Sequence, residues 1–400
     1  MGGIAAAQGF TLLISPLLTR LYTPHDFGVL SLVLGAGSLI GSAVHGRLTL
    51  AIARSNSLDE GLEVVDVALL ISVVGAFFAG LGIWTVAQIV GSSVYTLPVV
   101  SAIVFMGICA AHIDIFNYWQ SFTGAFYVSA KNAASRSIMT GVAQLLLSIF
   151  GAVGLTIGAI TGALMSVSNS YRLRKSYIVP SVQKIRHVLT VHKSYPFYSM
   201  PQGLLASASL NGIPLLLANF YGAGIAGQYW LAYRVLLAPI ALIGGSYRQV
   251  FHAQLSGTCR DLSSIYGRAF KHTVIMAFVI MPFALLTFAY GVDVFRLAFG
   301  EKWEIAGLFS GYLVICFSMD ILKVPAISIL HSLNKQRFLL EYEAVLAVLR
   351  LGLVAYFCMY DDALIAIQVF AAISACAAFF LIVFSYRVSR VSLKSTINDQ

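Results

Sequence analysis

A few charged side chains lie inside long apolar stretches of this chain, and their chemistry gives the first indication of a site. Arg234 lies near the middle of "GIAGQYWLAYRVLLAPIALIGG", and Arg350 lies near the middle of "YEAVLAVLRLGLVAYF". A guanidinium group offers a planar fork of donors that matches phosphate and carboxylate oxygens. The two arginines therefore predict a cationic site for an anionic headgroup such as a pyrophosphate. An equal alternative is that each is a structural charge, neutralised by a carboxylate or by carbonyls at a helix end.

Three further charged residues interrupt apolar stretches. Asp320 and Lys323 are three residues apart in "FSMDILKVPAISIL", so on a helix they share a face and can pair. Pairing is the favoured interpretation; the alternatives are that Lys323 binds the anion and that Asp320 couples an ion. Asp114 in "AAHIDIFNYW" lies near His112, which makes it a candidate proton site. The favoured interpretation for Asp114 is that its carboxylate reaches toward water at the end of its stretch.

Uncharged polar side chains occur in two of the stretches, with Gln8 near the N-terminus and Gln202 and Asn211 near the middle of the chain. They can line a cleft beside the arginines or hydrogen-bond between neighbouring helices, and both interpretations stay open. The five cysteines have no C-x-x-C spacing and four lie in apolar stretches, so they are expected to be small hydrophobic residues. No metal site, disulfide or cofactor is predicted, and coupling to H+ or Na+ is left open.

The composition indicates which elements must hold these residues. Hydrophobic residues make up 59% of the 400 residues and charged residues only 10%, with a mean hydropathy of +0.85. A soluble globular chain is about 25% charged, so the solvent of this chain is lipid. Apolar stretches of about 20 residues suit transmembrane helices, whereas barrel strands alternate apolar and polar residues, which these stretches do not. The predicted fold class is an all-α, multi-pass membrane protein.

Twelve stretches are long and apolar enough to be transmembrane helices. The first is expected to stay as a helix, because no basic segment precedes it as in a signal peptide. Between the first two, Pro24 is expected to form a tight turn, with His25 and Asp26 capping and charging the next helix. The approximate limits of the twelve are 2–19, 27–46, 64–89, 98–118, 137–152, 154–171, 196–219, 223–245, 272–291, 305–329, 338–359 and 363–386.

The positions of the basic residues predict the orientation of these helices. Most of the 25 Lys and Arg residues follow even-numbered stretches, and only Arg20, Arg296 and Lys302 follow odd-numbered ones. Loops rich in Lys and Arg face the cytoplasm, so both termini are predicted to be cytoplasmic. This distribution accounts for the net charge of +9, which therefore does not indicate nucleic-acid binding. The most basic loop, 172–195, can also contact anionic lipid headgroups.

A weak internal repeat divides the chain into two halves. The segment "PLLTRLYTPHDFG" aligns with "PLLLANFYGAGIAG" after a one-residue gap, which places Tyr22 on Tyr221 and Gly28 on Gly227. A fainter alignment places "ICAAHIDI" on "ICFSMDI". The period is six stretches, an even number, so both halves have the same orientation and are predicted to be related by a pseudo-two-fold axis along the membrane normal.

The repeat predicts a domain organisation of two six-helix lobes. The lobes are 1–171 and 196–386, joined by a basic cytoplasmic linker at 172–195 and followed by a cytoplasmic tail at 387–400. Two such lobes enclose a cleft that opens alternately to either side of the membrane, which is how parallel-repeat transporters work. The candidate residues are expected to line this cleft.

Five segments carry a resemblance to a known family. They are "PLLTRLYTPHDFGVLSL", "GRLTLAIARS", "FYSMPQGLLASASLNGIPLLLANFYGAGIAGQYWLAYRVLLAPIALIGGSYRQVFHAQLS", "FGEKWEIAGLF" and "PAISILHSLNKQRFLL", and the third is the most specific. With them the chain resembles the bacterial oligosaccharide flippases of polysaccharide biosynthesis, the O-antigen type. That family belongs to the superfamily of multidrug, oligosaccharidyl-lipid and polysaccharide exporters, which also holds the multidrug and toxin extrusion antiporters.

The resemblance implies a transporter that moves an undecaprenyl-pyrophosphate-linked sugar unit between the leaflets of the bacterial inner membrane. Such a protein would serve O-antigen, capsule or exopolysaccharide synthesis. Its expected partners are the lipid-linked oligosaccharide, membrane lipids, and the polymerase and glycosyltransferases of the same pathway. Arg20, Arg47, Arg234 and Arg350 lie where segments of this kind keep a basic residue, so Arg20 and Arg47 join the candidates for a cationic cleft.

Two other functions were weighed against a flippase. A cation-exporting antiporter of the same superfamily needs buried carboxylates in its N-terminal half, where Asp114 is the single carboxylate predicted well inside a stretch. A membrane-bound glycan polymerase or ligase needs a large outward loop for catalysis, and the longest predicted outward loop, near 292–304, is short and has no acid–base or nucleophile cluster. An anionic cargo and a transporter without catalytic residues fit the sequence better.

Overall fold

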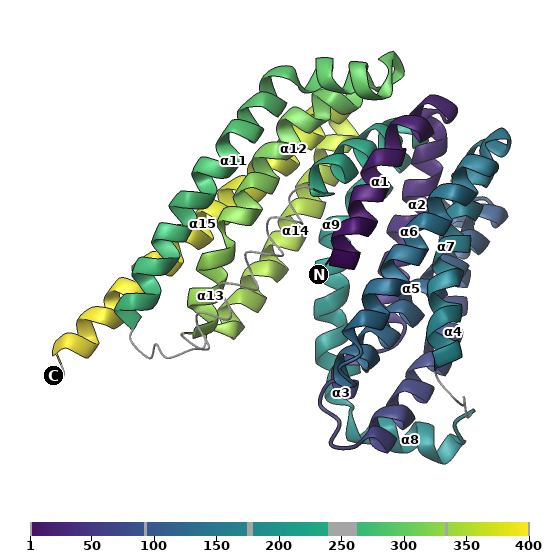
Figure 1. The fold of residues 1–400 in the computed structure, drawn as a ribbon, viewed down its shortest axis with the longest axis horizontal. Coiled ribbons are helices and arrows are strands. Elements are labelled where there is room, and N and C mark those ends of the chain that lie inside the picture. The colour runs from purple at the N-terminus through teal and green to yellow at the C-terminus, as the bar shows by residue number, and fades with distance from the viewer. Residues whose placement is uncertain (1, 92–93, 174–178, 239–261, 333–334, 399–400) are drawn as a thin grey trace. The chain divides into compact units, whose positions relative to one another are not determined.

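The computed structural model describes residues 2–91, 94–173, 179–238, 262–332 and 335–398, and these residues form helices with no strand among them (Figure 1). They belong to two compact units, Met1–Trp230 and Leu231–Gln400. The predicted lobes, 1–171 and 196–386, were defined by the sequence repeat, whereas the two units are defined by compactness. The lobes stay a prediction.

The N-terminal unit contains nine labelled α-helices, two short helical turns and the start of a further helix at residues 223–238. The bounds are α1 Gly2–Leu21, α2 Pro24–Ala43, α3 Thr49–Ile52, α4 Leu58–Val90, α5 Leu97–Phe122, α6 Phe126–Leu146, η1 Ser148–Phe150, α7 Gly151–Leu173, α8 Val182–Val191, η2 Tyr195–Ser199 and α9 Met200–Tyr221.

The C-terminal unit contains five labelled α-helices and one short helical turn in its described residues. Their bounds are α11 Leu262–Phe299, η3 Glu301–Trp303, α12 Glu304–Leu322, α13 Val324–Ser332, α14 Gln336–Tyr360 and α15 Ala363–Asn398. Helices α11 and α15 both pack along α12, and α14 packs along α15 (Figure 1).

Within the described residues, helices occupy the positions of all twelve predicted stretches, with 239–245 of the stretch 223–245 lying outside them, and the all-α membrane fold is confirmed. Eight helical segments of the described residues are long and apolar enough to cross a membrane, which makes the chain a multi-pass membrane protein. They are Pro24–Ala43, Leu58–Val90, Leu97–Phe122, Ser148–Arg172, Tyr195–Tyr221, Phe270–Phe299, Glu301–Ile327 and Ala363–Val388. The count of twelve spans stays a prediction.

Helix α2 begins at Pro24, three residues before the predicted start. The N-cap is Thr23, whose backbone N–H donates to Asp26 Oδ2 at 2.8 Å while the Asp26 N–H donates to Thr23 Oγ1 at 3.3 Å. This reciprocal capping box satisfies two backbone donors of the first turn, and Pro24 fills a position where no donor is needed. The predicted capping by Asp26 is confirmed, and the N-cap itself is Thr23 rather than His25.

Several other helix boundaries differ from the predicted limits, among them the ends of α11 and α15, and two of these differences have a visible cause. Helix α6 starts at Phe126 rather than 137, because the helix continues through Lys131 and Arg136, where an apolar window stops. The predicted stretch 305–329 is divided at Lys323 into α12 and α13. Pro325 explains this break, because proline has no N–H to continue the helical ladder.

Helix α2 lies at the centre of the N-terminal unit and packs against α5, α7 and α9 (Figure 1). Its glycines allow close approach: a Cβ at Gly41 would meet the Cβ of Ala110 at 2.7 Å, and a Cβ at Gly107 of α5 would meet Ile40 at the same distance. Small residues that let backbones approach are typical of helix contacts in membranes.

The two glycines that the repeat aligns meet in the structure. A Cβ added to Gly28 would lie against the backbone of Ala223, and a Cβ added to Gly227 would lie 2.7 Å from the backbone nitrogen of Gly28. The first turn of α2 therefore crosses the first turn of helix 223–238 backbone to backbone. The repeat and its pseudo-two-fold axis stay predictions.

Candidate functional site

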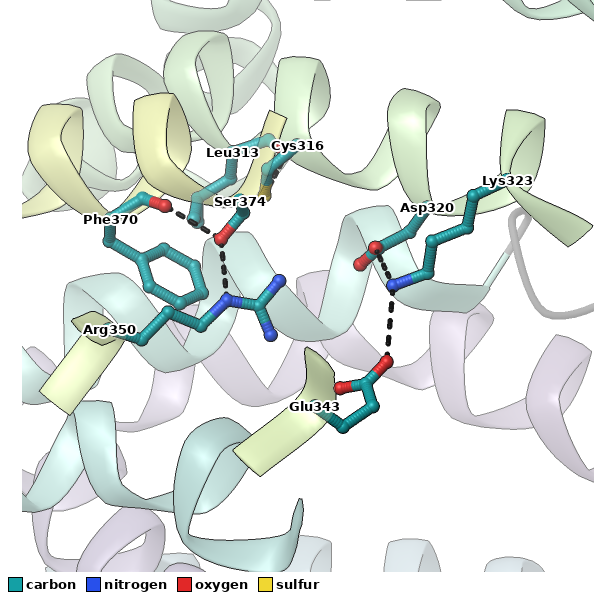
Figure 2. Close-up of polar contacts among 8 residues, drawn as sticks. All are labelled: Leu313, Cys316, Asp320, Lys323, Glu343, Arg350, Phe370 and Ser374. Atoms are coloured by element: carbon teal, nitrogen blue, oxygen red, sulfur yellow. Dashed lines mark hydrogen bonds and ion pairs between the residues drawn. The ribbon is translucent and has the colours of Figure 1, made fainter. Parts of the chain in front are cut away.

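Arg350, on α14, is the most buried of the candidate cations, with 4% of its surface exposed. Its Nε–H donates to Ser374 Oγ at 2.9 Å, and the Ser374 hydroxyl donates to the backbone oxygen of Phe370 at 2.7 Å (Figure 2). The guanidinium carbon lies 5.6 Å from the centre of the Phe370 ring, a cation–π contact of about 0.5–2 kcal/mol. Both partners lie on α15, so the arginine is anchored to one neighbouring helix.

Lys323, at the break between α12 and α13, is surrounded by carboxylates (Figure 2). Its Nζ lies 2.7 Å from Asp320 Oδ1, which confirms the pair expected from their spacing, and 4.0 Å from Glu343 Oε1 on α14. Lys323 also caps the C-terminus of α12, where the helix dipole favours a positive charge.

Figure 2 shows two neighbouring groups, one around Arg350 and one around Lys323, with no hydrogen bond or ion pair drawn between them. Arg350 and Asp320 both lie within electrostatic range of Tyr233 and Cys316. Two cations, Arg350 and Lys323, thus share this part of the C-terminal unit with two carboxylates, Asp320 and Glu343. The positive charge that remains for binding an anion depends on how far the two carboxylates already neutralise the two cations.

Arg234 lies in helix 223–238 and is half-buried. Within the described residues no hydrogen bond or ion pair of its side chain is found, whereas its neighbour Tyr233 packs edge-on against Phe317 at 5.3 Å between ring centres. Residues 239–261, which complete the predicted stretch 223–245, lie outside the described residues. The functional and structural interpretations of Arg234 both stay predictions.

Arg47 belongs to a cluster at the C-terminal end of α2 in the N-terminal unit. Its backbone N–H donates to His45 Nδ1 at 3.2 Å, and His45 Nε2 lies 3.0 Å from Asp114 Oδ2 on α5. The imidazole of His45 is fully buried, whereas 40% of the Asp114 side chain is exposed. The carboxylate reaches an exposed position, as favoured, but its histidine partner is His45 and not the sequence neighbour His112.

The remaining candidates are more peripheral. Arg20 is exposed in the last turn of α1, and Gln202 is exposed in the first turn of α9. Gln8 is half-buried on α1. The Asn211 amide donates to Ser207 within its own helix, to the backbone oxygen at 3.1 Å and to Oγ at 3.2 Å. The two units are described separately, so a shared cleft lined by these residues stays a prediction.

Three side chains of these clusters, His45, Glu343 and Ser374, were not predicted from the sequence, nor was a buried carboxylate elsewhere in the N-terminal unit, Asp66. Asp66 is a second carboxylate in the N-terminal unit, buried on α4 with 8% of its surface exposed. The signal for Asp66 was present, since it lies near the start of the predicted stretch 64–89. The others become visible only when separate helices are brought together.

Tyr22 holds the turn between α1 and α2 in place. Its hydroxyl donates to the backbone oxygen of Gln144 on α6 at 2.5 Å. Burial, with a smaller contribution from the charge of Asp26, raises the pKa of Tyr22 to about 12, so the phenol stays a donor. A repeat residue thus ties the start of α2 to the rest of the unit.

A cavity of about 660 Å³ in the N-terminal unit lies apart from these clusters. It is lined by α2, α4 and α9, and its walls are apolar except for Tyr95 and Asn219. None of the candidate charges lines it. Among the described residues, no three His, Cys, Asp or Glu side chains are grouped closely enough to hold a metal ion.

A family comparison decides the class of protein. The family model described as "polysaccharide biosynthesis protein" matches residues 17–306, most of the chain. The chain belongs to this family. The family and the membrane-spanning helices together make the chain a membrane protein of polysaccharide biosynthesis. No curated protein matches the chain by sequence.

Solved structures show the same fold at low sequence identity. The lipid II flippase MurJ in an inward closed conformation is similar with a TM-score of 0.71 and 12% identity, over 99% of this chain and 92% of that one. An inward-facing multidrug resistance MATE transporter is similar with a TM-score of 0.55 and 14% identity, over 98% and 94%. A transporter of the MOP superfamily from Pyrococcus furiosus, described as having a binding pocket of reversed polarity, is similar with a TM-score of 0.55 and 13% identity, over 98% of this chain and 94% of that one.

Proposed function

We propose that this protein is a flippase of the bacterial inner membrane that moves a polyprenyl-pyrophosphate-linked oligosaccharide from the cytoplasmic to the outer leaflet by alternating access. The observation that carries the proposal is the polysaccharide biosynthesis family match over residues 17–306 in a chain with a transporter fold. Polysaccharide units built on a membrane lipid must cross the bilayer before they are assembled outside. A transporter within that pathway has this intermediate as its natural cargo.

Buried cations support an anionic headgroup as the part of the cargo that is recognised. Arg350 is buried on α14, within the predicted stretch 338–359, where insertion scales put the cost of a central arginine at about 2.5–3.5 kcal/mol. Arg47 lies in the turn after the span Pro24–Ala43. Such residues are kept where they contact a cavity, a partner or a substrate. The planar guanidinium fork matches a pyrophosphate, whose oxygens accept paired hydrogen bonds.

A cation-exporting antiporter is the rival function. Asp66 weakens the sequence argument against it, because the N-terminal unit holds a buried carboxylate besides Asp114. The two functions predict opposite cargo charges, so an assay with a pyrophosphate-linked lipid separates them.

The test is transport by the purified protein in proteoliposomes, with a fluorescent polyprenyl-pyrophosphate oligosaccharide whose outer-leaflet fraction is quenched by dithionite. Arg350→Ala is expected to reduce the transport rate about tenfold or more, the loss of one charge-assisted bidentate contact. Arg337→Ala is the matched control, because Arg337 lies on the same helix, is exposed and pairs with Glu341 at 3.0 Å on the surface.

Three outcomes are decisive. Lost transport in Arg350→Ala with normal transport in Arg337→Ala supports an anion site at Arg350. Equal transport in both variants removes Arg350 from that site. No transport of the lipid by the unaltered protein, together with proton-dependent export of a cationic dye, overturns the flippase in favour of the antiporter.

A further inference from the structure

The turn that follows α2 has an unusual backbone. Gly46 has φ +59° and Arg47 has φ +55°, and Arg47 is the one residue other than glycine with a positive φ in the described part of the chain. A side chain with a Cβ is disfavoured in this left-handed conformation. The surrounding structure must therefore hold Arg47 there, as is common where a residue is positioned for function.

The side chain of His45 adds a contact to the turn, beside the backbone hydrogen bonds from Gly46 to Ala43 and from Leu48 to His45. A backbone N–H can only donate, so His45 Nδ1, 3.2 Å from the Arg47 nitrogen, must carry a lone pair. The ring proton of the neutral imidazole is then on Nε2, which donates to Asp114 Oδ2 at 3.0 Å. The neutral Nε2–H tautomer is the form of His45 that satisfies both partners.

The result of this turn is a fixed position for the Arg47 guanidinium against α9. A Cβ added to Gly203 would lie 2.6 Å from Arg47 Nε and 2.7 Å from Cζ, so the group rests on the bare backbone of α9. Arg47 Nε is buried and has no hydrogen-bond partner. The adjacent Gly46 packs against Pro196, just before α9. The Nε–H is thus held against α9 without a hydrogen-bond acceptor.

We propose that His45 is a positioning residue: in its neutral form it holds Arg47 against α9, and its protonation releases Arg47. A protonated ring carries a hydrogen on Nδ1, which would face the Arg47 N–H as a second donor, so the bond that fixes the turn is lost. The consequence for transport rests on the proposed function, in which Arg47 contacts the anionic headgroup. The effect of His45 on the turn is independent of that function.

Charged groups of both signs lie beside His45. Asp114 on α5 accepts from its Nε2–H, and Arg47 in the same turn donates its backbone N–H to Nδ1. Arg54, whose Nη1 donates to the Tyr195 hydroxyl at 3.4 Å before α9, adds a second cation on the same side. The release is therefore tested by changing the pH, because histidine is the side chain whose charge change lies nearest neutral pH.

The first test measures hydrogen exchange of the Arg47 amide in the detergent-solubilised protein at neutral pH. His45→Leu removes the acceptor and is expected to accelerate exchange about fivefold or more, the value of one net hydrogen bond. His45→Asn places an amide oxygen where Nδ1 lay, so its exchange is expected to stay within about twofold of the unaltered protein. Unchanged exchange in His45→Leu would overturn the positioning role whatever the cargo.

The second test is the pH profile of transport in proteoliposomes. The unaltered protein is expected to lose transport as the pH falls from about 8 to about 5, while His45→Asn, which cannot titrate, keeps a flat profile. A falling profile in His45→Asn would show that another group is responsible and would overturn the proposal. If Arg47→Ala transports normally while the exchange results hold, Arg47 does not contact the cargo, and the failure lies with the proposed function of that residue.

Discussion

The two units hold their buried arginines by different means. In the N-terminal unit, Arg47 rests on the backbone of α9 and owes its position to a left-handed turn and to glycines that let chain segments approach closely. In the C-terminal unit, Arg350 is held by a hydroxyl and an aromatic ring on α15. The position of Arg47 thus depends mainly on backbone conformation, and the position of Arg350 depends on side-chain contacts. Substitutions should therefore affect them in different ways.

The largest effect is expected where the N-terminal unit brings two backbones together. Gly227→Ala would place a Cβ against the Pro24 carbonyl oxygen and 2.7 Å from the Gly28 nitrogen, and rigid backbone atoms cannot move aside. We expect a loss of about 3 kcal/mol or more in the free energy of unfolding, measured by denaturant titration in detergent. Gly224→Ala, in the same helix with no atom nearby, is the control and should be neutral or slightly stabilising. Equal losses in the two variants would contradict the crossing.

A smaller effect is expected from the side-chain anchor of the C-terminal unit. Ser374→Ala removes the acceptor of the Arg350 Nε–H inside the protein, which should cost about 1–3 kcal/mol in the same measurement. Ser385→Ala is the matched control, because this hydroxyl on α15 donates to its own helix at Ile382. A change below about 0.5 kcal/mol in both would show that Ser374 does not anchor the arginine.

The smallest effect on stability, with a larger one on transport, is expected at Gly203. Here an added Cβ meets the flexible end of Arg47 rather than backbone, so Gly203→Ala should cost less than about 1 kcal/mol while it displaces the guanidinium. Transport of the lipid-linked oligosaccharide is expected to fall, and the fall should disappear when the same substitution is made in an Arg47→Ala background. Additive losses in the double variant would mean that Gly203 acts independently of Arg47.

The sequence predicted the helices better than the sites. Long apolar stretches determine transmembrane helices almost by themselves, and the spacing of Asp320 and Lys323 was enough to predict their pair. Pro325 indicates the break at Lys323 in the sequence, but a search for long apolar segments does not take proline into account. The start of α6 was missed for a similar reason, because helix continues through Lys131 and Arg136.

The contacts of Arg47 and Arg350 could not be predicted, because each depends on residues far away in the chain. His45 was hidden by the nearer His112, and proximity in sequence proved a poor guide to the partner of Asp114. The left-handed turn at Arg47 has no local signal except the glycine before it. Ser374 is one of many serines in apolar stretches, and only the packing of α14 on α15 selects it.

The meeting of Gly28 with Gly227 has a consequence for how the two halves of the chain can change over time. A side chain on Gly28 would collide with the backbone of Ala223, and one on Gly227 would collide with the backbone of Pro24 and Gly28. Since backbone atoms cannot be made smaller, a substitution of the neighbouring residue cannot compensate for a larger residue at either position. Both positions are therefore expected to remain glycine in any working variant.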